Sequence, residues 1–253
     1  MTGNDLRRRW KLPQISMTGT NLKIYGCVTM AFYSISMSVI QHGMLHVDQY
    51  SNVELREMLA ADPERMLLST WGSLFQLVGG LAIPVFAFLL VEGFQHTRNF
   101  RAYLLRMLAF AAVSEIPYDF AMSGKPLDWS GQNMLLTLSV CLVMLYGMRM
   151  FSASRLVQVL IVVAAVFWVS LMKGSFGLCM VLLAAAYYVL YEKPRARMVA
   201  GSIISLMYVT GPLSTFVLRN YNGQRGEARW KYLFYVLYPL HLVILGAITY
   251  FLA

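Results

Sequence analysis

Charged residues are scarce in this chain of 253 residues. They make up 13% of the sequence and hydrophobic residues make up 58%, whereas a soluble domain typically carries about 25% charged residues. The mean hydropathy of +0.57 agrees with this bias. The composition excludes an ordinary soluble domain and predicts an integral membrane protein.

Cysteine and acidic residues are also few. Cys27, Cys141 and Cys179 lie within apolar runs without the spacing of metal ligands, so we expect packing residues and no metal site. Basic residues outnumber acidic ones, 21 to 12. Because most basic residues lie between apolar runs, the excess indicates the orientation of membrane helices, and we expect no nucleic-acid partner.

The apolar runs predict the fold class. A helix needs about 20 mostly apolar residues to cross a lipid bilayer. Eight segments meet this criterion, at roughly 20–43, 70–93, 102–121, 133–150, 155–172, 175–191, 198–218 and 232–252. The sequence therefore predicts an all-α polytopic membrane protein, a bundle of about eight transmembrane helices. We expect a basic, cytoplasmic segment over 1–19, one helical domain over 20–253, and a surface helix at 52–60.

Lysine and arginine predict the orientation, because short cytoplasmic loops carry an excess of them. A cytoplasmic N-terminus places RRRWK, the 94–101 loop and EKPRAR on the cytoplasmic side. The basic segment RNYNGQRGEARWK at 219–231 disagrees, because eight spans place it outside. Either the span count is off by one, or these basic groups bind an anionic ligand.

Ionisable side chains interrupt the apolar runs, where each costs about 2.5 to 3.5 kcal/mol on insertion scales. Glu92 and His96 are four residues apart, so they share a helix face. Glu115 and Asp119 have the same spacing, with Pro117 between them to kink or end the helix. Such groups persist where they pair with one another or line a wet cavity.

Two interpretations of these groups stay open. Glu92, His96 and Arg106 form either a structural ion network at the cytoplasmic lip or the wall of a polar cavity, and Glu92 is the expected partner of Arg106. His241 follows Pro239 in the apolar core of the last span. It is either a hydrogen-bonded core side chain or a general base, since imidazole titrates near neutral pH.

Four stretches, together and in this order, resemble the TraX family of membrane proteins. They are IPVFAFLLVEGFQHTRNFRAYLLRMLAFAAVSEIPYDFA from residue 83, NMLLTL from residue 133, YNGQRG from residue 221 and KYLFYVLYPLHL from residue 231. The resemblance covers the chain from about Leu22 to the C-terminus. The family is linked to N-terminal acetylation of a pilin, and it resembles polytopic acyltransferases that use cytoplasmic acetyl-CoA.

The resemblance implies a multi-pass protein of the bacterial cytoplasmic (inner) membrane with acetyl-CoA as its acyl donor. The implied acceptor is an amine or hydroxyl, on a protein N-terminus, a sugar or a small amine. The implied catalytic residues are His241, His96, Glu92 and Glu115, with one of the carboxylates orienting the basic histidine. The implied acetyl-CoA-binding residues are Arg98, Asn99, Arg106, Asn222 and Arg225, and we add Arg101 as a further group that could hold the CoA phosphates.

The first span departs from the family pattern. Where members carry Asp-His, this chain carries Tyr33 and Ser34, and the next histidine is His42, two helical turns further along. If the family uses that histidine as its base, this chain relies on another base or does not acetylate. The alternative function is therefore a membrane transport or binding protein for a small polar solute, whose buried charges form a relay or substrate site.

Overall fold

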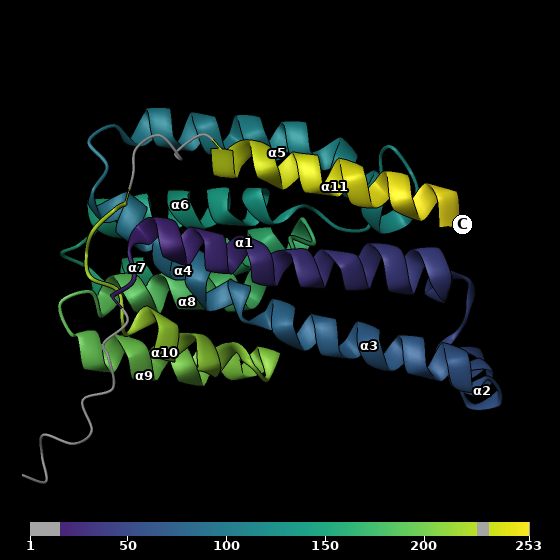
Figure 1. The fold of residues 1–253 in the computed structure, drawn as a ribbon. Helices are drawn as coiled ribbons and strands as arrows, with labels where there is room; N and C mark the ends of the chain where they lie inside the picture. Colours follow the sequence, from purple (N-terminus) through teal and green to yellow (C-terminus); the bar gives the residue numbers. More distant parts are fainter. Residues whose placement is uncertain (1–15, 227–232, 253) are drawn as a thin grey trace, which may run out of the picture.

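Helices make up most of the structure, as the apolar runs predict (Figure 1). The computed structural model describes residues 16–226 and 233–252. Its α-helices are α1 (Gly19–Ile35), α2 (Asn52–Ala61), α3 (Pro63–Gly80), α4 (Ala82–Gln95), α5 (Phe100–Ser123), α6 (Met134–Met150), α7 (Arg155–Leu171), α8 (Gly177–Val189), α9 (Pro194–Ser205), α10 (Ser214–Leu218) and α11 (Leu233–Leu252). A π-helical stretch, Ser36–Met44, continues α1. The predicted all-α class is confirmed for the described residues.

Three stretches are long and apolar enough to cross a membrane. They are Gly19–Met44, Pro63–Gln95 (α3 and α4) and Leu233–Leu252. Helices α6, α7 and α8 are also apolar but shorter, with 17, 17 and 13 residues. The described helices are therefore those of a membrane protein, and the number of eight spans stays a prediction.

Several helices begin where the sequence supplies a capping side chain. The predicted cap at Asn133 is confirmed, since its side-chain oxygen accepts from the backbone N–H groups of Leu135 and Leu136. Ser51 and Glu54 form a capping box at the start of α2, which confirms the expected surface helix. In a membrane such caps pair backbone groups that no water would satisfy.

The region around Pro117 does not end α5. The helix continues through the proline to Ser123. Asp119, beyond the proline, accepts a hydrogen bond of 2.9 Å from the backbone N–H of Asp128 in the following loop. The proline therefore lies within a continuous helix, and Asp119 fixes the loop that leaves it.

The segment expected to span over 198–218 is not one helix. The chain enters the bundle as α9, turns at 206–213 and returns as the short α10. The two helices lie together at the end of the bundle where α1 begins (Figure 1). The turn lies against the junction of α3 and α4, where the Thr210 hydroxyl donates to the Leu77 carbonyl and the Ser214 hydroxyl donates to the Leu81 carbonyl. These hydroxyls satisfy carbonyls exposed where α3 gives way to α4.

The chain after α10 returns to the start of α1. The backbone N–H of Met17 donates to Asn220, that of Asn222 donates to Met17, and that of Gly19 donates to Gln224, at 2.9, 3.0 and 2.7 Å. The 219–226 loop therefore lies at the same end as the start of the described chain. An even number of crossings before this loop accounts for its basic residues without a ligand, which favours the first of the two sequence-based explanations.

The two ends of the bundle carry opposite charge. One end, hereafter the basic end, holds the start of α1, the loops after α4, α6 and α8, and the 219–226 loop; its basic residues are Arg98, Arg101, Arg149, Arg155, Lys193, Arg195, Arg197, Arg219 and Arg225. The other end carries most of the acidic residues, Asp48, Glu54, Glu57, Asp62, Glu64 and Asp128, with fewer basic ones. This asymmetry is typical of a protein with one fixed orientation in its membrane.

Helices α1 and α3 cross closely at Gly79. A Cβ added there would lie 2.4 Å from the Cβ of Tyr33 and 3.0 Å from its Cα. We expect Gly79→Ala to lower the free energy of unfolding by about 1 to 3 kcal/mol, because overpacking forces the helices apart. Thermal unfolding in detergent measures this. Gly147→Ala on α6 is the control, since its nearest neighbour would be 3.4 Å away, and an equal loss there would contradict the account.

The position of the 219–226 loop can be tested by labelling from each side of the membrane. We expect a cysteine at Gln224 to react with a membrane-impermeant maleimide from the same side as a cysteine at Ser152, in the loop after α6. A cysteine at Ser130, before α6, should react from the opposite side. If Gln224→Cys reacts from the same side of the membrane as Ser130→Cys, the result would contradict the reversal of the chain at 206–213.

Candidate functional site

His241 meets Ser34 inside the bundle. Nε2 of His241 lies 3.3 Å from Oγ of Ser34 on α1, and Nδ1 lies 3.1 Å from the carbonyl oxygen of Leu237. Ser34 is 1% exposed. His241 is eight residues into α11, so the pair lies about 12 Å along this helix from its start.

The contact with Leu237 fixes the tautomer of His241. Because a carbonyl oxygen only accepts, Nδ1 carries the proton and Nε2 is the acceptor that faces the Ser34 hydroxyl. A neutral imidazole in this orientation can take a proton from an attacking group. In the described structure the ring nitrogens of His241 contact Leu237 and Ser34 rather than Glu92 or Glu115, so the expected orienting role of a carboxylate is not seen.

Glu115 belongs to a polar group beside this pair. The Asn133 amide donates to the Glu115 carboxylate. The backbone N–H of Met134 donates to the Tyr238 hydroxyl at 3.3 Å, and the Tyr238 ring centroid lies 5.4 Å from that of His241. Oε1 of Glu115 is buried without a hydrogen-bond partner among the described residues. Tyr238 thus lies beside His241 and contacts the start of α6, where Asn133 binds Glu115, but no hydrogen bond among the described residues joins Tyr238 to this carboxylate.

Glu92 forms an ion pair with Arg197 at the basic end. Its Oε1 lies 2.9 Å from Nη1 of Arg197, and the Tyr191 hydroxyl donates to Oε2 at 3.3 Å. His96 is half-exposed, and its Nδ1 lies 2.8 Å from the backbone oxygen of Glu92 and 3.9 Å from Oε2. The expected pairing of Glu92 with Arg106 is wrong, because α9 begins beside the end of α4 and Arg197, in its first turn, pairs with the carboxylate. The geometry favours the structural interpretation of Glu92.

Aromatic rings surround Arg197. Its guanidinium carbon lies 4.2, 4.9 and 5.4 Å from the ring centroids of Phe88, Tyr191 and Tyr187. Cation–π contacts contribute about 0.5 to 2 kcal/mol and offset part of the cost of burying the charge. Nε and Nη2 of Arg197 have no hydrogen-bond partner among the described residues. Arg197 therefore retains unused donors.

A cavity of about 540 Å³ opens beside Arg197, within the range of about 300 to 1,000 Å³ for ligand sites. It lies between α4, α9 and the end of α10, and its lining residues are Phe88, Pro194, Arg195, Arg197, Met198, Val199, Leu218, Arg219 and Tyr221. One of the two interpretations placed Glu92 and His96 in the wall of a cavity. Neither residue lines this cavity, whereas Arg197, the ion-pair partner of Glu92, does.

The expected acetyl-CoA-binding residues gather at the basic end without forming one site. Asn99 caps α5 by accepting from Ala102, and Asn222 donates to Ser16. Arg98 and Arg101 are exposed. The charges of Arg106 and Arg225 both act on Tyr103, so each of them lies in the neighbourhood of this tyrosine. The structure thus separates the candidates into this end and the deeper Glu115–His241 region.

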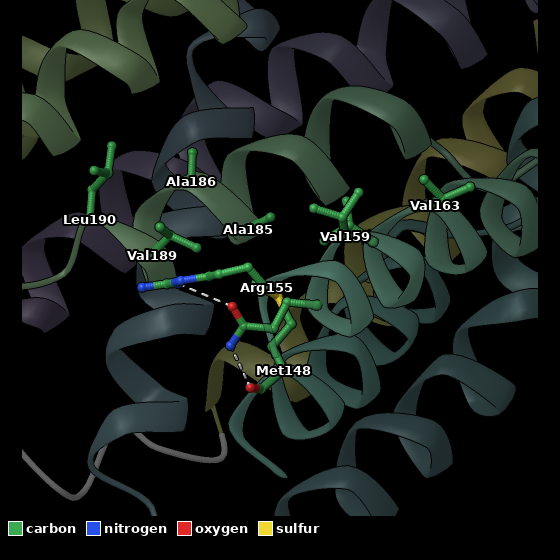
Figure 2. A pocket seen from close by; sticks show the side chains of 10 residues that line it. Met148, Arg155, Val159, Val163, Ala185, Ala186, Val189 and Leu190 are labelled. Atoms are coloured by element: carbon green, nitrogen blue, oxygen red, sulfur yellow. Dashed lines mark hydrogen bonds between the residues drawn. The ribbon is translucent and has the colours of Figure 1, made fainter. Parts of the chain in front are cut away.

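A second, apolar groove of about 450 Å³ lies between α6, α7 and α8. Figure 2 shows Arg155 at its side, donating to Gln158 at 3.1 Å, while Gln158 donates to the backbone oxygen of Met148 at 2.9 Å. The rest of the lining is aliphatic. A groove of this kind offers no group that reacts, and it fits a lipid-facing surface.

Sequence reasoning missed the arginines that line the cavity. Arg195 and Arg197 entered the analysis only as evidence of orientation, and Arg219 only as one of the basic groups of 219–231 that could bind an anion. Spacing along the chain does not reveal which arginine turns inward. The sequence does contain a signal for the turn that assembles them, the dipeptide Gly211-Pro212 inside an apolar run.

These features define a polytopic α-helical membrane protein with polar side chains held in its interior. The chain belongs to the TraX family, since it matches the family described as TraX protein over residues 35–249. The match begins directly after Ser34, so the divergent stretch at Tyr33 and Ser34 lies outside it. The resemblance had been expected to begin at about Leu22.

The chain is similar to a protein of Dichelobacter nodosus named probable fimbrial assembly protein FimC, serogroup H1. The two are 27% identical over 209 residues, which cover 70% of this chain and 83% of the relative. No solved structure matches this chain.

The Glu92–Arg197 pair can be tested by a double-mutant cycle. We expect Glu92→Gln and Arg197→Met each to lower the free energy of unfolding by about 3 to 5 kcal/mol, because each leaves a buried charge uncompensated. The double variant should lose less than the sum of the two. Denaturation in detergent measures all three, and strictly additive losses would contradict the pairing.

Proposed function

We propose that this chain is a membrane-integral acyltransferase that moves an acetyl group from acetyl-CoA to an amine or hydroxyl acceptor. The observation that carries the proposal is the Ser34–His241 pair, an imidazole with an accepting nitrogen and a defined tautomer inside a membrane bundle. An ionisable side chain within a membrane-spanning helix is costly unless the group is used or paired. Membership of the TraX family supports the assignment.

His241 acts as the general base in this proposal. The acceptor nitrogen or oxygen attacks the thioester carbonyl. Nε2 of His241 gives up its hydrogen bond from the Ser34 hydroxyl and takes the proton of the attacking group. The carbon–sulfur bond then breaks, and the proton passes to the departing CoA thiolate. Glu115, the carboxylate bound by Asn133 in the same region, stabilises the imidazolium that forms between these steps.

The proposed orientation places the basic end in the cytoplasm of a bacterial inner membrane. Six crossings before the 219–226 loop, together with α9 and α10 entering and leaving from the basic end, put this loop and the start of α1 on the cytoplasmic side, and α11 makes the seventh crossing. The arginine excess at this end supports the orientation. Acetyl-CoA then approaches from the cytoplasm, and His241 lies about 12 Å inward along α11.

The proposed acceptor is a protein N-terminus, a sugar or a small amine. The name of the Dichelobacter nodosus relative, a probable fimbrial assembly protein, supports a fimbrial subunit as the first acceptor to try. Amine and hydroxyl acceptors must both lose a proton when they attack the thioester, so a general base serves either one.

The proposal is tested with the purified chain in nanodiscs, radiolabelled acetyl-CoA and a panel of acceptors. We expect His241→Gln to lower kcat by about 100-fold or more, because general-base catalysis contributes roughly 10² to 10⁴. We expect Ser34→Ala to lower it by about tenfold or less, the value of one neutral hydrogen bond of about 0.5 to 1.5 kcal/mol.

His46→Asn is the matched control. His46 lies beyond the π-helical stretch with φ of 48°, a conformation that asparagine tolerates. Full activity of His241→Gln would overturn the proposal. Flux of a small solute into vesicles, with no CoA released, would instead support the alternative of a transport protein.

A further inference from the structure

The arginine-lined cavity has the features of a site for a phosphate group. Three guanidinium groups line it, from Arg195 and Arg197 on α9 and Arg219 just after α10, and the lining residues include no aspartate or glutamate. The cavity exists only because α9 and α10 lie side by side. A single straight helix over 198–218 would have separated Arg197 from Arg219.

Arg197 carries the argument for a ligand. Its side chain is 7% exposed, and only Nη1 is used, by Glu92. Nε and Nη2 are buried without a partner among the described residues. Unsatisfied donors on a buried charged group cost about 1 to 3 kcal/mol or more each, so an acceptor in the cavity would stabilise them.

The charge and shape of the lining indicate the chemistry of that acceptor. Glu92 offsets one of the three positive charges, which leaves the site positive. The guanidinium fork suits the oxygens of a phosphate, which it can bind with two parallel hydrogen bonds. Phe88, Met198 and Leu218 give the same cavity an apolar wall.

We infer that this cavity binds the phosphate or diphosphate group of an amphiphilic ligand, held by Arg197 in the interior and by Arg195 and Arg219 at the mouth. Two sources supply this chemistry at the basic end: the diphosphate of an acyl-CoA donor, or the headgroup of an anionic phospholipid. That the ligand is the acyl-CoA donor rests on the proposed function, whereas the existence of a phosphate site does not.

The test measures binding to the purified full chain in nanodiscs of zwitterionic lipid. Isothermal titration with CoA and with inorganic pyrophosphate gives the affinity, and a second set of nanodiscs contains anionic phospholipid. We expect Arg195→Gln/Arg219→Gln to weaken binding at least tenfold, because each charged hydrogen bond is worth about 1.5 to 3 kcal/mol. Arg149→Gln/Arg155→Gln, the same charge change at the same end, should weaken it less than threefold.

A third variant distinguishes binding inside the cavity from general attraction of an anion to the positive charge of the basic end. Val199 lines the cavity and is 59% exposed, so Val199→Trp fills space without altering charge and should also weaken binding at least tenfold. Equal losses in the two arginine pairs, or no binding of CoA, pyrophosphate or anionic lipid, would overturn the inference.

The two sources give different results. If the donor is the ligand, CoA binds in zwitterionic nanodiscs and Arg195→Gln/Arg219→Gln raises the KM for acetyl-CoA with little change in kcat. If the lipid is the ligand, anionic phospholipid displaces pyrophosphate and CoA does not. If the chain binds a ligand through these arginines but transfers no acetyl group, the result would support the site and contradict the proposed function.

Discussion

The buried ion pair between Glu92 and Arg197 is the interaction on which the basic end depends. A carboxylate on α4 and a guanidinium on α9 are costly in a membrane unless each meets the other. Their distance of 2.9 Å requires α9 to begin beside the end of α4, and the turn at 206–213 then returns the chain to the same end. The cavity and the contact of the 219–226 loop with α1 both follow from this reversal.

The polar side chains divide between two depths with different chemistry. The basic end offers guanidinium groups, rings and a cavity, which suit an anion. The interior offers the Ser34–His241 pair and the Glu115 carboxylate in the same region, which suit proton transfer. An acyl-CoA molecule has the same division, with phosphates at one end and a thioester at the other, and this correspondence makes one account of both regions possible.

Much of the fold was predictable from the sequence, because apolar runs and caps such as Asn133 are local signals. The reversal in 198–218 was not, since the segment reads as one apolar run of the length of a span and only Gly211-Pro212 indicates a turn. The interior site was half predictable: His241 and Glu115 were identified as ionisable groups in apolar runs. Ser34 and Arg197 were not, because their importance comes from contacts between helices far apart in the sequence.

The reversal of the chain is tested most directly by a crosslink between Met17 and Tyr221, which lie opposite one another in an isolated backbone bridge. Met17→Cys/Tyr221→Cys would be made in a chain whose three native cysteines are replaced, and oxidised in native membranes. The account predicts rapid formation of an intramolecular disulfide, since paired backbones bring the two Cα atoms within the usual limit of about 7 Å. A pair that stays reduced, while each single cysteine reacts with maleimide from opposite sides of the membrane, would contradict it.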